Sequence, residues 1–152
     1  KIIRIGSAGG YTDQTDVYDV VLADSAFSLS SYAKTMSGDE SHLMYPSKEL
    51  NEEIFASAKK LGYPIHVGRI HSSDNFYYDE GHNGQGEENG CLAVEMESFA
   101  LFHNADILHK KAACLLTISD SFVSHKVTTP EERQKSFTKM MEIALECAEW
   151  AN

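Results

Sequence analysis

Two acidic residues near the middle of the sequence are spaced so that they could act on one ligand. Glu95 and Glu97 are separated by one residue, and on a strand this spacing puts both carboxylates on one face, with Met96 on the other. Two carboxylates on one face repel each other unless a ligand or a cation shares them. At the carboxyl end of a strand, where α/β proteins bind ligands, such a pair suits the vicinal hydroxyls of a sugar. The alternative is a pair of solvated acids.

A second candidate lies where the apolar run AACLLTI ends at Ser119 and Asp120. Arg133 follows in the first turn of a predicted helix, where a cation gains nothing from the helix dipole. An acid at a strand end and an arginine on the facing helix could form a pair that opens and closes. A turn residue and a solvated arginine fit the sequence equally well.

The segment RIGSAGG (4–10) directly follows the short run KII and predicts a strand that passes into a glycine-rich turn. Backbone N–H groups of such a turn can approach an anion, and Arg4 and Ser7 would add a positive charge and a hydroxyl. The glycines have neither the Walker nor the dinucleotide-binding spacing. A plain tight turn therefore remains the alternative to an anion site.

Composition excludes several classes of partner. The chain has 152 residues, enough for one domain, and 13 basic against 23 acidic residues give a net charge of −10. We therefore expect neither nucleic acid nor an anionic membrane as a partner, because both require a positive field. Three widely spaced cysteines without a CxxC motif indicate a reducing, cytoplasmic compartment. No His, Cys and Asp cluster has metal-ligand spacing, so no metal is expected.

The elements that would position these residues alternate between strand and helix. Strands are expected at 1–6, 19–24, 64–74, 91–97 and 111–120, and helices at 46–62, 98–110 and in one long helix after the N-cap Thr129. Residues 25–45 are expected to form a polar surface excursion. The segment 79–90, with four glycines and no apolar side chain, is expected to be a mobile loop. This order predicts an α/β domain with a largely parallel sheet.

Five segments, taken in order, resemble the nucleoside phosphorylase superfamily, and within it the bacterial-type hexameric purine nucleoside phosphorylases. They are RIGSAGG (4–10), SSDNFYYDE (72–80), AVEMES (93–98), TISDS (117–121) and TTPEERQKSF (128–137). The resemblance implies one three-layer α/β/α domain over residues 1–152, with a mixed, largely parallel central sheet, and a homohexamer built as a trimer of dimers. The family has a further N-terminal segment, so we expect sequence ahead of Lys1.

The resemblance also implies a role for each candidate residue. Phosphate would be bound by Arg4 and Ser7, ribose by Glu95, Met96 and Glu97, and the purine base by Phe76, Val94, Ser119 and Phe122. The implied reaction is phosphorolysis of purine (deoxy)ribonucleosides to the free base and (deoxy)ribose 1-phosphate. Inorganic phosphate is the co-substrate, and no cofactor is implied.

In the implied mechanism Asp120 is the general acid for N7 of the base, and Arg133 closes on Asp120 late in the reaction. Asp120 could protonate a 6-amino or a 6-oxo purine, so the sequence predicts no preference between them. One alternative is a hydrolytic nucleosidase of the same fold, acting on methylthioadenosine or adenosylhomocysteine, which would have no need of Arg133. Another is a domain that binds nucleosides without catalysis.

Overall fold

The computed structural model describes residues 1–79 and 84–149, and this part of the chain folds into six strands and six helices. The strands are β1 (Ile2–Gly10), β2 (Val20–Phe27), β3 (Leu43–Met44), β4 (His66–Ser72), β5 (Ala93–Glu95) and β6 (Ala112–Ser121). The helices are α1 (Tyr32–Ser37), α2 (Lys48–Leu61), α3 (Gln85–Glu88), α4 (Ser98–Ile107), α5 (Pro130–Lys135) and α6 (Thr138–Glu149).

The strands form one mixed sheet in the order β3-β2-β4-β5-β1-β6. The pairings β1–β6, β2–β4 and β4–β5 are parallel, and β1–β5 and β2–β3 are antiparallel. A further antiparallel pairing between β2 and β6 closes five of the strands into a ring. The prediction of an α/β chain with a mixed sheet is confirmed, but antiparallel pairing is more frequent than expected, and no pattern in the sequence indicated the closure.

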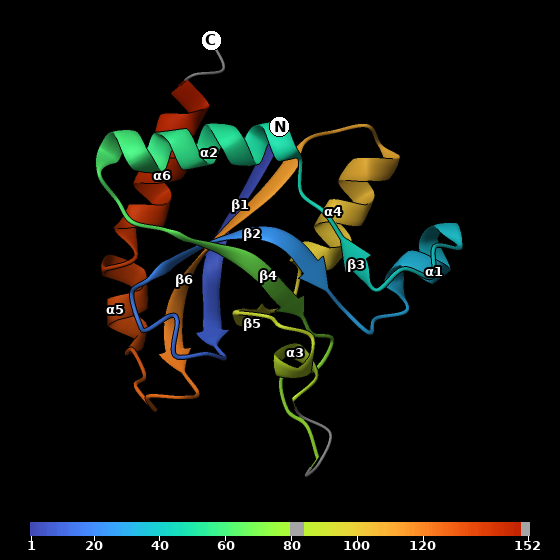
Figure 1. Ribbon diagram of the computed structural model, residues 1–152, viewed down its shortest axis with the longest axis horizontal. Helices are drawn as coiled ribbons and strands as arrows, with labels where there is room; N and C mark the ends of the chain where they lie inside the picture. Colours follow the sequence, from blue (N-terminus) through green and yellow to red (C-terminus); the bar gives the residue numbers. More distant parts are fainter. Residues whose placement is uncertain (80–83, 150–152) are drawn as a thin grey trace.

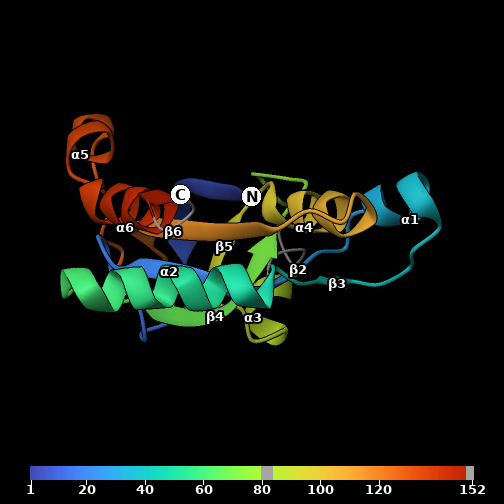
Figure 2. The same ribbon diagram turned by 90° about the horizontal axis from the view of Figure 1, so that it is seen from above.

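Helices cover the sheet on two sides. One apolar cluster joins α4 to β6 and β1, with Phe99, Phe102 and Ile118 among its buried members. The other joins α2 and α6 to the opposite face of β6, with Ile54 and Ile143 in its centre. In both views α2 and α6 lie toward one side of the molecule, and α1 and α4 toward the other (Figures 1 and 2).

The glycine-rich segment is not a turn. β1 continues without interruption to Gly10, and residues 2–10 pair in parallel register with β6, from Ile2 opposite Ala112 to Gly10 opposite Ser121. The predicted turn after residue 6 is therefore wrong. A long β6, buried along most of its length, supplies a partner for every residue of the segment, and this tertiary pairing outweighs the preference of glycine for turns.

Helix ends follow the sequence closely, except in the last helix. α2 begins after Ser47, whose hydroxyl accepts from Leu50 N, and ends at Gly62, whose φ of 73° is the left-handed conformation that glycine favours. The capping box at Thr129 is also present. The predicted single long helix is wrong, however, because α5 ends at Lys135 and α6 begins at Thr138. Phe137 lies between them, buried in the α2–α6 cluster.

Two predicted irregular segments contain helix. Residues 25–45 hold the end of β2, α1 and β3. Within the predicted loop 79–90, residues 85–88 form the helical turn α3, while residues 80–83 lie outside the described part of the chain. A loop at 85–88 is therefore wrong. Gly86 is buried because its missing side chain lets α3 approach the ring of Tyr11.

Across residues 1–79 and 84–149, no helix is both long and apolar enough to span a bilayer. Cys91, Cys114 and Cys147 are all buried free thiols.

Candidate active site

Arg4 of β1 holds the two predicted sugar-binding carboxylates. Its Nη2 forms an ion pair with Glu97 and lies 3.5 Å from Glu95 Oε2. β5 runs antiparallel to β1, with Gly9 opposite Val94, so the chain after Glu95 runs back along β1 toward Arg4. The cation that the paired carboxylates require is thus an arginine of the neighbouring strand.

Gly6 makes this contact possible. A β-carbon on Gly6 would lie 3.0 Å from Arg4 Cζ and still closer to Nη1. The guanidinium therefore passes over Gly6 through the space that any side chain there would fill. Its Nη1 is buried and has no hydrogen-bond partner among the described residues. A donor left unpaired in this way favours an acceptor that the chain itself does not provide.

Glu95 belongs to the interior. Its side chain is only 1% exposed, and its carboxylate accepts from Glu97 N at 3.0 Å, from Ser98 N and Oγ at 3.0 and 2.9 Å, and from Ser72 Oγ. These bonds satisfy the N–H groups at the start of α4, a position where a carboxylate also gains from the helix dipole. The hydrogen-bonding capacity of Glu95 is used within the protein, and Glu95 links Arg4 to the start of α4.

Glu97 faces outward. It is the N-cap residue of α4, and its side chain is 60% exposed despite the ion pair with Arg4. Met96, between the two acids, is also exposed. Of the three predicted ribose residues, Glu97 and Met96 are accessible to a ligand, and Glu95 is not.

A second cluster forms around Gly9. The register between β1 and β6 shifts after Ala8, which pairs with Ile118, so that Gly9 pairs with Asp120 and Ser119 becomes the extra residue of a β-bulge. A β-carbon on Gly9 would lie 3.2 Å from Asp120 Oδ2 and 2.8 Å from Phe122 Cζ. The bulge and the glycine therefore bring a carboxylate and an aromatic ring to the same point.

Ser119 supports Asp120. The Ser119 hydroxyl lies 2.7 Å from Asp120 Oδ1 and 3.2 Å from the carbonyl oxygen of Ala8, and Ser119 is buried. Its position suits a residue that orients the Asp120 carboxylate.

Arg133 does not contact Asp120. Its Nη1 donates to the carbonyl oxygen of Thr128 at 2.6 Å. Thr128 in turn donates from N and Oγ1 to the carbonyl oxygen of Ser119, at 2.9 and 2.7 Å. Arg133 is thus connected through Thr128 to the residue before Asp120, and the direct pair considered from the sequence is not formed.

The other predicted residues lie apart from these contacts. Val94 is half-buried in β5, paired with both Gly9 and His71. Ser7 is exposed on β1, between the two clusters. Phe76 is 76% exposed, and its ring meets Tyr77 edge-on, so the structure does not bring Phe76 to Phe122.

Sequence reasoning missed a group of rings beside the Gly9 cluster. Tyr11 lies between Phe122 and His71, with ring centroids 5.6 and 6.1 Å away, and its hydroxyl is 2.9 Å from His71 Nδ1. Burial lowers the pKa of His71. Tyr11 follows the glycine pair directly, a position that could have drawn attention to it, whereas no pattern marks His71.

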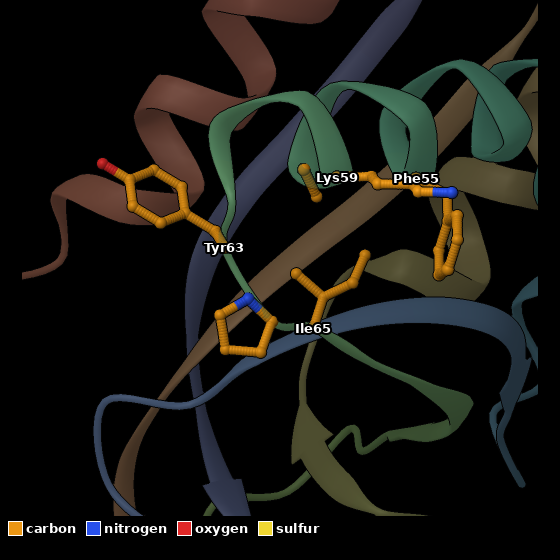
Figure 3. A pocket seen from close by; sticks show the side chains of 6 residues that line it. Phe55, Lys59, Tyr63 and Ile65 are labelled. Carbon is orange, nitrogen blue, oxygen red and sulfur yellow. The ribbon is translucent and has the colours of Figure 1, made fainter.

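Two cavities lie away from these residues. One of about 370 Å³ is lined by Phe55, Ala58, Lys59, Tyr63, Pro64 and Ile65, between the end of α2 and the start of β4 (Figure 3). A larger one lies along α6 and the first half of β1. Among the residues that the structure describes, no three His, Cys, Asp or Glu side chains are grouped to hold a metal ion.

Known proteins match almost the whole chain. The family model described as "Phosphorylase superfamily" matches residues 1–149. DeoD-type purine nucleoside phosphorylases are similar to this chain: that of Mycoplasma genitalium is 41% identical over 148 residues (95% of this chain, 62% of that protein). Those of Clostridium beijerinckii and Streptococcus pneumoniae are 39% and 40% identical over 96% of this chain, and the chain spans 62% and 63% of their lengths. The chain belongs to the phosphorylase superfamily.

Proposed function

We propose that the protein to which this chain belongs phosphorolyses purine nucleosides, releasing the base and (deoxy)ribose 1-phosphate. The observation that carries the proposal is the content of one strand: β1 offers Arg4 beside Glu97, and Gly9 beside Asp120 and Phe122. The strand between Gly6 and Gly9 spans about 10 Å. A cation, an exposed acid, a second acid and an aromatic ring are the groups that a nucleoside and a phosphate together require.

Phosphate attacks C1′ of the ribose while the glycosidic bond breaks, so positive charge grows on the sugar and negative charge on the purine. We assign phosphate binding to Arg4 and Ser7. The unpartnered Nη1 of Arg4 supports this assignment, since it is a buried donor in need of an acceptor. Glu97, accessible at the start of α4, would accept from the ribose hydroxyls, with Met96 against the sugar.

Asp120 is proposed as the general acid, because a proton delivered to N7 neutralises the charge that develops on the leaving base. Phe122 and Val94 would form walls of the base site, with Phe76 as a further wall. Ser119 orients the Asp120 carboxylate. Arg133 would have to exchange the Thr128 carbonyl for Asp120.

The wider setting is proposed with the reaction. We place the described elements in a single three-layer α/β/α domain, with helices on both sides of the mixed sheet. We also propose a cytoplasmic homohexamer, a trimer of dimers, that uses phosphate as co-substrate and no cofactor. The relatives are named for purine nucleosides, and this supports the substrate class.

The decisive experiment measures cleavage of inosine and adenosine by the full-length protein with and without phosphate. Phosphorolysis predicts turnover that requires phosphate, and Asp120→Asn should lower kcat by about 100- to 10,000-fold while sparing substrate binding. Asp39→Asn is the matched control, because Asp39 lies on an exposed loop, where it accepts a hydrogen bond from Ser41 N. Cleavage that ignores phosphate would refute the proposal in favour of a hydrolytic nucleosidase.

If ligand-dependent function survived both Asp120→Asn and Glu97→Ala unchanged, catalysis itself would be refuted, and a nucleoside-binding domain would remain.

A further inference from the structure

A row of aromatic rings leads from the core to the candidate base site. Phe27 is buried, and its centroid lies 5.7 Å from the ring of His71. His71 is followed by Tyr11 at 6.1 Å, and Tyr11 by Phe122 at 5.6 Å. Only Phe122, at the end of the row, is largely exposed, at 49%. The exposed ring of the site therefore packs on the half-buried ring of Tyr11.

The hydrogen bond between Tyr11 and His71 fixes the ring of Tyr11. Tyr11 Oη and His71 Nδ1 are 2.9 Å apart, and His71 is buried, so this bond satisfies a ring nitrogen that water does not reach. The backbone of Tyr11 is held as well, because its N–H donates to the carbonyl oxygen of Leu92. Neither the ring nor the backbone of Tyr11 can turn without breaking one of these two hydrogen bonds.

Helix α3 closes over the same pair. A β-carbon on Gly86 would lie 2.8 Å from Tyr11 Cζ and 3.0 Å from His71 Nδ1. The buried Gly86 therefore brings the backbone of α3 directly against both rings. Tyr11 is packed by Phe122 on one side and His71 on the other, with α3 at its edge.

We propose that Tyr11, held by His71, is a positioning residue of the base site, fixing the ring of Phe122 beside Asp120. The inference rests on the proposed function for the identity of the ligand, a purine. Phe122 reaches the point above Gly9 where Asp120 Oδ2 also lies, and Tyr11 is the ring on which Phe122 packs. A shift of Tyr11 would move the wall of the site relative to the proton donor.

The test uses three variants of the full-length protein and measures affinity for a free purine base, hypoxanthine or adenine, by calorimetry. Tyr11→Leu removes the ring under Phe122 and should weaken purine binding about tenfold, a loss of about 1.4 kcal/mol. Tyr11→Phe keeps the ring but leaves His71 Nδ1 without its partner, and should weaken binding about three- to tenfold. The KM for nucleoside should rise in parallel, with the KM for phosphate unchanged.

The double variant Tyr11→Phe/His71→Phe distinguishes this bond from a general loss of stability. Removing both partners of a buried hydrogen bond costs far less than removing one, so purine affinity should return to within about threefold of the wild type. Equal losses in Tyr11→Phe and in the double variant would overturn the role of His71. Wild-type affinity in all three variants would overturn the role of Tyr11.

Tyr63→Phe is the matched control. It also deletes a tyrosine hydroxyl bonded to a side chain, that of Glu142, but at the cavity of Figure 3, remote from β1's carboxyl end. Purine affinity should not change in this variant.

A wild-type protein that binds purine but does not phosphorolyse nucleosides would refute the proposed function alone, and the variants would still decide the inference. A wild-type protein that does not bind purine would overturn both.

Discussion

The guanidinium of Arg4 occupies the space that a side chain on Gly6 would fill. Arg4 Cζ is 3.0 Å from the position of a β-carbon on Gly6, and the same arginine pairs with Glu97 across the neighbouring chain segment. Gly6 lies two residues after Arg4, on the same face of β1, and its missing side chain leaves room for the Arg4 guanidinium.

Gly6→Ala should therefore separate function from stability. The methyl group displaces the flexible end of Arg4, so the phosphate KM should rise about tenfold or more. The fold should lose little, because alanine in a strand is favoured over glycine by about 0.5–1 kcal/mol. Steady-state kinetics with varied phosphate, together with thermal melting, measures both. Gly9→Ala is the matched variant: it meets Phe122 and should raise the KM for nucleoside instead. An unchanged phosphate KM in Gly6→Ala would contradict the assignment of Arg4.

Glu95→Gln should mainly reduce stability, whereas Glu97→Gln should mainly reduce activity. Glu95 is buried and satisfies the start of α4, so Glu95→Gln should lower the free energy of unfolding by about 2 kcal/mol or more. Glu97 is largely exposed, and Glu97→Gln should leave stability within about 1 kcal/mol while lowering kcat/KM for nucleosides. Urea denaturation and kinetics on both variants check this. The interpretation of Glu95 as an internal residue fails if its variant is stable but inactive.

Stability should depend on pH through His71. Burial lowers its pKa below the ordinary value of 6.5, so the unfolded chain binds the proton more readily than the folded one. The stability that comes from keeping His71 neutral is fully present above pH 6.5, and it is lost as the pH falls below that value toward the pKa of His71 in the folded protein. Urea denaturation at several pH values should show this loss in the wild type. In His71→Phe the free energy of unfolding should change less with pH than in the wild type, and an identical pH dependence would argue against a neutral buried histidine.

The native thiols should be inert. Burial raises the pKa of Cys91 and Cys114 to about 12, and it also raises that of Cys147. Thiolate is the reactive form, so a disulfide reagent at mildly alkaline pH should label none of the three before unfolding and all of them afterwards. Rapid labelling of the native protein would contradict their burial.

Periodic patterns predicted the elements well. The 3.6-residue period and the terminal glycine located α2, and the apolar run located β6. The segment at Gly6 and Gly9 was misread because local preference favours a turn, whereas a partner strand distant in the sequence imposes an extended chain. The break at Phe137 was missed for a similar reason, since burial against α2 is not visible in the helical pattern.

Within the site, the prediction that Glu95 and Glu97 share one face of a strand is wrong, because β5 ends at Glu95 and Glu97 is the N-cap residue of α4; Arg4 nevertheless contacts both carboxylates. The hydrogen bonds from Ser72 and from the start of α4 to Glu95 could not be predicted from the sequence, because they depend on which strands are neighbours. The same is true of Thr128, which holds Arg133, and of Tyr11 and His71. Contacts between residues that are distant in the sequence produce no periodic pattern along the chain, so they cannot be predicted from periodicity.

The ring of strands constrains the order in which the molecule can form. β6 pairs with β1 and β2, although β3, β4 and β5 all lie between these strands and β6 in the sequence. Gly9 therefore has no Asp120 beside it until the ribosome has made β6. Contacts between such distant segments slow folding, because a long loop must close before they form. During synthesis the edges of β1 and β2 that pair with β6 remain without this partner, and in that interval a chaperone or a second nascent chain has its best opportunity to bind them.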